Sequence, residues 1–393
     1  MDNLQFNKKD YSMFHIITFF SLTAIFIVSN LYIMIPLLDS VSITFSISTT
    51  QASLSISAFS FFYAFGLIFF GSLSERFGLK ETISVGLFIL TILMIVSYYI
   101  SNFSAFLILR GFQGFWAATF APVSFIYIFN VLSLKHQGIT IAVINTGFLS
   151  AGVVGQLFSS SIHLFWGWEG VFISLSLLYL FLFIYSLKCL PRPTKPAQSR
   201  SVHLLIRTLL KIPFRKDLRK LYFITFTILL TFVAYYTALE NYYSTILGLP
   251  PENTLVIRSF GLTGLLLTIL SNKISGRIGF ENTIFMGLTL MLTGVLCSTS
   301  SIILFLIFGS VIFVAGTSIT IPSLIYIISI KGAENKSLAI SMYSFILLIG
   351  ASFGSGITII TNYYAKLAFL SLILLCSLLS ILMEKRSQLV SAS

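Results

Sequence analysis

Long apolar stretches separated by short polar segments occupy most of the chain. Residues 14–36 and 224–239, for example, contain no Asp, Glu, Lys or Arg. An α-helix needs about 20 apolar residues to cross a hydrocarbon core about 30 Å thick. A strand of a membrane barrel would instead show about ten residues of alternating polar and apolar positions, which these stretches do not show. The pattern therefore predicts helices that span a membrane.

Polar residues divide the apolar stretches into twelve predicted spans, six on each side of a long polar segment. The first six cover residues 13–37, 51–73, 81–100, 103–130, 138–163 and 168–187, and the second six cover 221–247, 254–275, 282–299, 302–330, 336–361 and 364–383. We therefore expect an all-α membrane protein with twelve transmembrane helices in two six-helix bundles. The bundles would comprise residues 1–187 and 221–393, joined by a basic linker over residues 188–220.

The composition agrees with this prediction, and the charges indicate an orientation. Hydrophobic residues make up 56% of the chain and charged residues only 9%, whereas a soluble domain carries about 25% charged residues. Of the 24 Lys and Arg, all but Arg110, Arg258 and Lys366 fall in or beside segments on the same side as the two termini. Because Lys and Arg concentrate in cytoplasmic loops, we expect a multi-pass protein of the cell (inner) membrane with both termini in the cytoplasm. The net charge of +12 therefore reports orientation, and we expect no nucleic-acid partner.

The linker over residues 188–220 is the longest polar segment. It holds ten Lys or Arg against one acidic residue, Asp217. Within it, residues 202–214 mix leucines with Arg207 and Lys211, a pattern typical of an amphipathic helix on an anionic membrane surface. A regulatory or partner-binding segment is the alternative interpretation.

Two loops of similar sequence lie half the chain apart. The segment after the second predicted span reads G-S-L-S-E-R-F-G-L-K over 71–80, and the segment after the eighth reads N-K-I-S-G-R-I-G-F-E over 272–281. Arg76 with Gly78 and Arg277 with Gly279 thus recur at a spacing of 201 residues. Duplication of a six-helix unit explains the repeat, and transporters built from such repeats bind their substrate between them near the bilayer midplane.

The first of these loops carries a family motif. It matches the loop between spans two and three of the major facilitator superfamily at Gly71, Leu73, Glu75, Arg76, Gly78 and Lys80. The whole chain resembles this superfamily, in particular its twelve-span branch of drug and metabolite efflux transporters. Glu75 stands where the family usually has aspartate, and Leu79 replaces a basic residue. The resemblance implies pseudo-two-fold symmetry and a gating latch that comprises Gly71, Glu75, Arg76, Gly78 and Lys80, with Arg277 in the second repeat.

A second match lies inside the fourth predicted span. Arg110, Gln113 and Gly114 reproduce an arginine, a glutamine and a glycine of the family at the same spacing. The resemblance implies that Arg110 takes part in proton coupling. An arginine inside an apolar helix is costly unless it faces a cavity or a polar partner. A structural clamp, in which Arg110 bonds carbonyl groups of neighbouring helices, is therefore the alternative.

The third match, on the fifth predicted span, is partial. Gly138, Gly147 and Gly155 fit the glycine pattern of efflux transporters, and Gly152 stands where that pattern has proline. We expect these four glycines to let helices pack closely. The missing proline removes an expected kink, so the pattern leaves both export and import open.

No site for catalysis or for a bound cofactor is recognisable in the sequence. A phosphate-binding G-x-x-x-x-G-K-[ST] loop does not occur, which excludes ATP hydrolysis on this chain. The four histidines fall on different segments and the three cysteines show no ligand spacing, so we expect no metal. We therefore expect neither an enzyme nor a cofactor, and a driving force from an ion gradient or from the substrate's own gradient.

Proton coupling requires a titratable residue at membrane depth, and few are present. Glu240, toward the outer end of the seventh predicted span, is the carboxylate candidate. Arg258 enters the eighth predicted span at a similar depth, so a structural Glu240–Arg258 ion pair is the alternative. We expect Asp39 to be a solvated residue at a helix end. Arg110 and Glu240 are therefore the candidate proton-coupling residues.

The resemblance places substrate contacts on the inward faces of the first, fourth, seventh and tenth spans. The candidates there are Asn30, Tyr32, Gln113, Trp116, Tyr235, Tyr236 and Asn241. Such a lining suits an amphipathic or weakly charged small molecule better than a sugar phosphate or a dicarboxylate. We expect a monomeric transporter in the lipid bilayer that exports small organic compounds in exchange for protons by alternating access. A proton-coupled importer and a non-transporting membrane sensor are the alternatives.

Overall fold

The computed structural model describes residues 13–192, 208, 211–248, 251–360 and 362–392, and this part of the chain is helical without strands. Its first half contains α1 (Met13–Tyr32), η1 (Ile35–Leu37), α2 (Leu38–Phe45), α3 (Thr49–Phe77), α4 (Leu79–Tyr98), α5 (Phe103–Ala117), α6 (Ala121–Val131) and α7 (Leu134–Cys189). Its second half contains η2 (Ile212–Phe214), α9 (Arg219–Thr245), α10 (Pro251–Gly261), η3 (Leu262–Leu265), α11 (Leu266–Ile278), α12 (Phe280–Cys297), α13 (Ile303–Lys331), η4 (Ala333–Asn335), α14 (Lys336–Ser355), η5 (Gly356–Ile359) and α15 (Tyr363–Ala392). The predicted linker helix over 202–214 lies largely outside the described residues.

Ten helices or runs of helices in the described part are long and apolar enough to cross a membrane. α7 covers two predicted spans and is broken at Gly167, whose φ of 71° favours glycine. The predicted eighth span is divided among α10, η3 and α11, so no single helix there reaches span length. The predicted all-helical fold of long apolar helices is thus confirmed, and the number of twelve spans stays a prediction.

Glycines of the two repeated loops end helices in the same way. Gly78, with φ 98°, separates α3 from α4, and Gly279, with φ 84°, separates α11 from α12. Residues with a side chain rarely adopt such a positive φ. The repeated R-x-G sequence therefore has the same structural cause in both halves of the chain.

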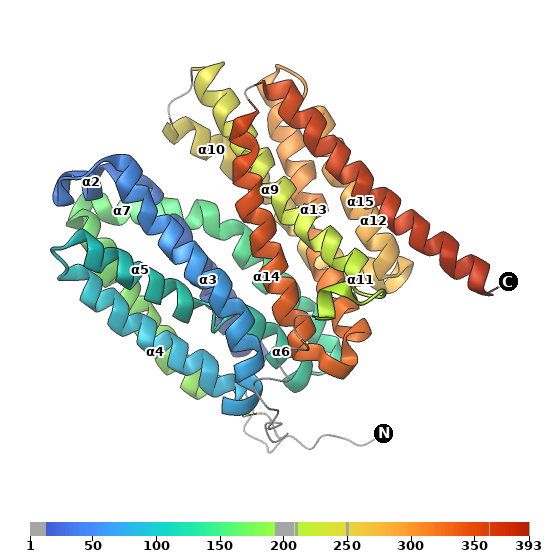
Figure 1. Cartoon of the computed structure of the whole chain (residues 1–393), viewed down its shortest axis with the longest axis horizontal. Helices are drawn as coiled ribbons and strands as arrows, with labels where there is room; N and C mark the ends of the chain where they lie inside the picture. Colours follow the sequence, from blue (N-terminus) through green and yellow to red (C-terminus); the bar gives the residue numbers. More distant parts are fainter. Residues whose placement is uncertain (1–12, 193–207, 209–210, 249–250, 361, 393) are drawn as a thin grey trace.

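Helices of each half pack mainly on helices of the same half. α1 packs on α7 and α3 packs on α5, whereas α12 packs on α13 and α9 packs on α14. Contacts between the halves join α14 to α3 and α6, and join α11 and α13 to α7. In Figure 1 the halves converge at the end that holds α6 and diverge toward the end that holds α10. We name these the α6 end and the α10 end.

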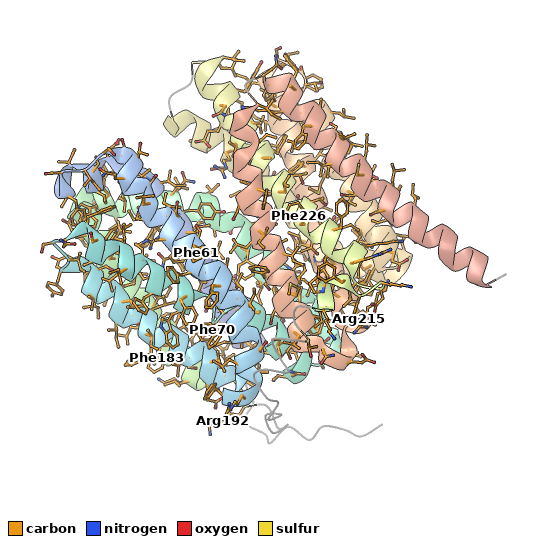
Figure 2. All side chains as sticks on the ribbon, in the orientation of Figure 1. Phe61, Phe70, Phe183, Arg192, Arg215 and Phe226 are labelled. Atoms are coloured by element: carbon orange, nitrogen blue, oxygen red, sulfur yellow. The ribbon has the colours of Figure 1, made fainter. Side chains whose placement is uncertain are left out.

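Large apolar side chains cover the outer surface of the helices. Phe61 and Phe65 of α3 are 70% and 58% exposed, and Leu372 and Leu379 of α15 are 59% and 56% exposed. Figure 2 shows side chains projecting outward from the helices at both edges of the molecule. Such a continuous apolar surface is unsuited to water, and it is what the hydrocarbon core of a bilayer requires.

Candidate functional site

A cavity of about 1130 Å³, including the part open to solvent, lies between the two halves. α1, α3, α6 and α7 line it from the first half, and α9, α10, α13 and α14 line it from the second. Its walls are mainly aliphatic and aromatic, and Arg258 is the one charged residue among the described lining residues. The uncharged polar groups are Tyr32, Tyr63, Asn145, Tyr236, Tyr343 and Ser344. A large apolar cavity with a few polar groups is the usual form of a small-molecule site.

Two of the seven predicted substrate residues, Tyr32 and Tyr236, line this cavity. Asn30 and Gln113 lie behind its wall, where the side-chain oxygens of both accept hydrogen bonds from Arg110. These two amides therefore support the fold around Arg110 and make no contact with the space of the cavity.

The other three predicted substrate residues also lie away from the cavity. Trp116 packs against Phe70, with 5.3 Å between the ring centroids. The Tyr235 hydroxyl lies 2.6 Å from Ser298 Oγ, directly after the C-terminus of α12. Asn241 is not among the lining residues.

Arg110 is completely buried, and its guanidinium has only neutral acceptors among the described residues. Nη1 donates to Asn30 Oδ1 and to Gln113 Oε1, both at 2.7 Å, and Nη2 donates to the Asn30 carbonyl at 2.9 Å. Nε donates to the Ser55 carbonyl at 3.4 Å, and Cζ lies 4.6 Å from the Phe59 ring centroid. The partners belong to α1, α3 and α5, so the guanidinium ties three helices together.

Phe59 separates Arg110 from the cavity, because its side chain contacts the guanidinium and also lines the cavity. Gln113 Nε2 donates to Ser97 Oγ at 2.7 Å, which extends the network to α4. This geometry is that of the structural clamp, with the arginine held in place by groups that do not titrate near neutral pH.

Arg258, on α10, contacts residues of both halves. Its Nη1 lies 3.9 Å from Glu240 Oε2 of α9, and its Cζ lies 4.8 Å from the Tyr236 ring centroid. On the opposite side, a Cβ added at Gly152 of α7 would lie 3.7 Å from Arg258 Nη2 and 3.7 Å from Tyr32 Cζ. The Glu240 side chain is 60% exposed, and 3.9 Å is too long for a hydrogen bond. The ion pair is therefore weak.

Small residues close the α6 end. A Cβ at Gly71 of α3 would overlap Ser341 Oγ of α14, and a Cβ at Gly138 of α7 would overlap the Asn272 side chain of α11. Both contacts join the two halves. Because small residues let helices approach closely, α3 and α14 and likewise α7 and α11 meet tightly at this end.

The charged residues of the predicted latch lie at the same end. Lys80 Nζ donates to the Leu190 carbonyl at 2.6 Å and so fastens the loop to the end of α7. Arg76 and Arg277 are exposed, and the Glu75 side chain lies outside the described part of the structure. The structure thus places Gly71 between the halves and Lys80 within the first half.

The end of the linker is fastened to the second half. Arg215 Nη2 donates to Asp217 Oδ2 at 2.8 Å and to the Lys331 carbonyl at 3.2 Å, and Nη1 lies 3.6 Å from Glu334 Oε2. The hydrogen bond from Arg215 lowers the pKa of the Asp217 carboxyl below its ordinary value. Figure 2 shows Arg192 and Arg215 toward the same end of the molecule, so the two edges of the linker lie at the α6 end.

The predicted packing glycines of α7 have three different surroundings. Gly147 and Gly155 face α1, where an added Cβ would lie 2.8 Å from Ala24 Cβ and 2.9 Å from Ser29 Cβ, respectively. Gly138 faces α11, and Gly152 lines the cavity beside Arg258. α7 therefore uses its small residues to contact its own half, the opposite half and the cavity.

Sequence reasoning missed several residues of the cavity wall. Phe59 and Tyr63 are four residues apart on α3 and share a helix face, a spacing visible in the sequence. Asn145 is a polar residue inside an apolar span, which is a signal for a functional position. From the sequence, Arg258 is a candidate only as the partner of Glu240, and the structure adds it to the cavity wall.

Comparison with solved structures shows the fold. The human organic anion transporter MFSD10 (TETRAN) superposes with a TM-score of 0.72 at 13% identity, over 94% of this chain and 99% of that chain. The transporter FucP in its outward conformation superposes with a TM-score of 0.73 at 14% identity, over 95% and 99% of the two chains.

Comparison with sequences shows the family. The family model of the Major Facilitator Superfamily matches residues 16–355. An uncharacterized transporter of Buchnera aphidicola subsp. Baizongia pistaciae is 27% identical over 88% of each chain. The uncharacterized MFS-type transporter YybF of Bacillus subtilis is 24% identical over 88% of this chain and 86% of that protein. The chain therefore belongs to the Major Facilitator Superfamily, and it is a multi-pass membrane transporter rather than an enzyme.

Proposed function

We propose that the chain is a secondary active transporter that moves small organic compounds through the central cavity by alternating access. The observation that carries this proposal is the position of the cavity, which lies between the two halves and takes its lining from both. Rocking of one half against the other would expose such a cavity to each side of the membrane in turn.

The described state would be open toward the α10 end. Contacts of Gly71 with Ser341 and of Gly138 with Asn272 hold the halves together at the α6 end. Opening at the α6 end would require α3 to part from α14 and α7 to part from α11.

The α6 end would face the cytosol of the cell (inner) membrane, with both termini on that side. Lys80, Arg192, Arg215 and Lys331 all lie in the contacts of this end, and Lys and Arg concentrate on the cytoplasmic side of membrane proteins. In intact cells, a membrane-impermeant thiol reagent should leave an Arg192→Cys variant unlabelled. Labelling of this variant would show that the α6 end faces the outside of the cell.

Export in exchange for protons is the first candidate direction, and it follows from the resemblance to efflux transporters. In this scheme Glu240 binds the proton, because it is the acid beside the cavity residue Arg258, and Arg110 positions α1, α3 and α5. Gly147 and Gly155 of the efflux pattern pack α7 against α1, which supports a shared mode of helix packing with exporters.

Import together with protons is the second candidate, and the Glu240–Arg258 geometry favours it. Protonation of Glu240 would remove the carboxylate that pairs with Arg258 at 3.9 Å. An anionic substrate would then bind Arg258 more tightly when Glu240 carries its proton. Binding linkage is reciprocal, so substrate and proton would travel together.

Glu240→Gln in reconstituted vesicles tests proton coupling in either direction. Candidate substrates are added under an imposed proton gradient while the internal pH is followed with a trapped dye. Because glutamine cannot exchange a proton, we expect the variant to lose substrate-coupled proton movement and to retain substrate exchange at equal pH. Opposite movement of substrate and protons indicates export, and parallel movement indicates import.

Asp39→Asn is the matched control, since Asp39 is an exposed acid in the first turn of α2. It should retain wild-type coupling. Unchanged proton movement in Glu240→Gln would exclude Glu240 from the coupling mechanism.

A further inference from the structure

The electrostatic character of the cavity is set by one side chain. Arg258 carries the single charge among the described lining residues, and its side chain is 21% exposed. No Asp or Glu stands among those lining residues to balance it. Among the acids that the structure describes, the nearest is Glu240, which is 3.9 Å away and mostly exposed, so it leaves much of the guanidinium charge unneutralised inside the cavity.

The guanidinium is held in an orientation that suits an anion. One face lies against the Tyr236 ring, and the Tyr236 hydroxyl is fixed by Ser310 Oγ at 2.9 Å. Nη2 points toward Gly152 of the opposite half, where the absence of a side chain leaves ordinary contact distance even for an added Cβ at 3.7 Å. A planar guanidinium with free N–H groups binds carboxylates and similar anions in a fork.

The rest of the cavity wall is suited to the apolar part of a ligand. Phe59, Phe125, Phe148 and Phe232 line the cavity together with leucine and valine side chains. The uncharged polar groups are hydroxyls and one amide, which can orient a ligand and carry no charge to balance a second anionic group. Burying an unpaired charge there would be costly.

We propose that the cavity binds small organic monoanions, with a carboxylate or sulfonate on Arg258 and an aromatic or aliphatic body against the phenylalanine wall. This assignment rests on the proposed transport function and adds the substrate class. It discriminates against organic cations, which meet an unneutralised guanidinium. It also discriminates against dianions, whose second charge finds no basic partner among the described lining residues.

The test is a charge series of ligands that share one ring system. 1-Naphthoate, its neutral amide 1-naphthamide, the cation 1-naphthylmethylamine and the dianion 1,8-naphthalenedicarboxylate are titrated against purified protein in detergent by calorimetry. We expect 1-naphthoate to bind the wild type at least about tenfold more tightly than the other three. A charge-assisted pair of hydrogen bonds from an arginine lowers the dissociation constant by about a factor of ten or more. Equal binding of naphthoate and naphthamide, or no naphthoate binding, would overturn the proposal.

Three variants test whether the Arg258 guanidinium causes the preference for naphthoate. Arg258→Gln should lose about tenfold or more in naphthoate affinity and keep its naphthamide affinity, whereas Arg219→Gln, at an exposed arginine at the start of α9, should bind both as the wild type does. Glu240→Gln should bind naphthoate more tightly than the wild type, because the competing carboxylate is gone. Wild-type naphthoate affinity in folded Arg258→Gln contradicts the assignment.

The experiment still gives an answer if Arg258→Gln does not fold, and it separates binding from transport. If Arg258→Gln does not fold, the ligand series on the wild type and the Glu240→Gln variant still decide the matter, and unchanged naphthoate affinity in Glu240→Gln counts against the site. The binding is measured without a membrane or a gradient. Failure of anion binding is therefore distinct from failure of transport, which is read from flux in vesicles.

Discussion

Arg110→Ala is expected to destabilise the protein by about 3 kcal/mol and to abolish transport, because it removes the buried group that joins α1, α3 and α5. The substitution leaves the Asn30 and Gln113 side-chain oxygens without their donor at 2.7 Å. Buried acceptors that lose a charged donor cost the full penalty of their desolvation. The measurement is the unfolding temperature of the purified protein in detergent, together with flux in vesicles.

Arg110→Lys and Arg219→Ala complete this experiment. Lysine keeps the charge and cannot reproduce the planar fork to Asn30 and Gln113, so it should lower the unfolding temperature nearly as much as alanine. Arg219 is exposed, and its replacement should change neither stability nor flux. A wild-type unfolding temperature in Arg110→Ala combined with lost proton coupling would show that Arg110 acts in the chemistry of coupling and not as a clamp.

Gly71→Val is expected to stop transport while the protein stays folded. Any Cβ at position 71 overlaps Ser341 Oγ, so valine would push α3 away from α14 at the α6 end. Overpacking of this kind costs about 1–3 kcal/mol, and a penalty confined to the closed α6 end shifts the conformational equilibrium away from that state by about 5- to 150-fold. Flux in vesicles measures the loss of transport, and the unfolding temperature shows whether the protein stays folded.

Gly276→Val is the matched control, since position 276 belongs to the corresponding loop of the second repeat and an added Cβ there meets nothing within 4 Å. It should transport as the wild type does. Wild-type flux in Gly71→Val would show that the tight contact between α3 and α14 is not part of the transport cycle.

The apolar pattern predicted the positions of the helices along the chain well, but it did not predict which side of each helix faces the cavity. A helix that is apolar on all sides has no distinct polar face, so its sequence does not indicate which side points to lipid and which to the cavity. Tyr235 and Tyr236 illustrate the difficulty. They are neighbours in the sequence, yet Tyr236 lines the cavity and Tyr235 bonds Ser298 on the other side of α9.

One interruption of the helices was predicted and another was not. The break of α7 at Gly167 falls between the predicted spans 138–163 and 168–187, whereas the division of the predicted eighth span among α10, η3 and α11 was not expected. α10, η3 and α11 form a weaker apolar stretch in which the cavity arginine, Arg258, sits. The repeated R-x-G motifs coincide with equivalent helix ends in the two halves, where a positive φ favours glycine.

Locking the α6 end tests alternating access through the central cavity most directly. Lys336 Nζ of α14 lies 4.3 Å from the Phe129 ring centroid of α6, so a reducible crosslinker as long as these two side chains together can join cysteines at the two positions. The variant carries serine in place of Cys189, Cys297 and Cys376. We predict that crosslinking stops flux, preserves ligand binding in the cavity, and is reversed by reduction. Undiminished flux through the fully crosslinked protein would contradict the account.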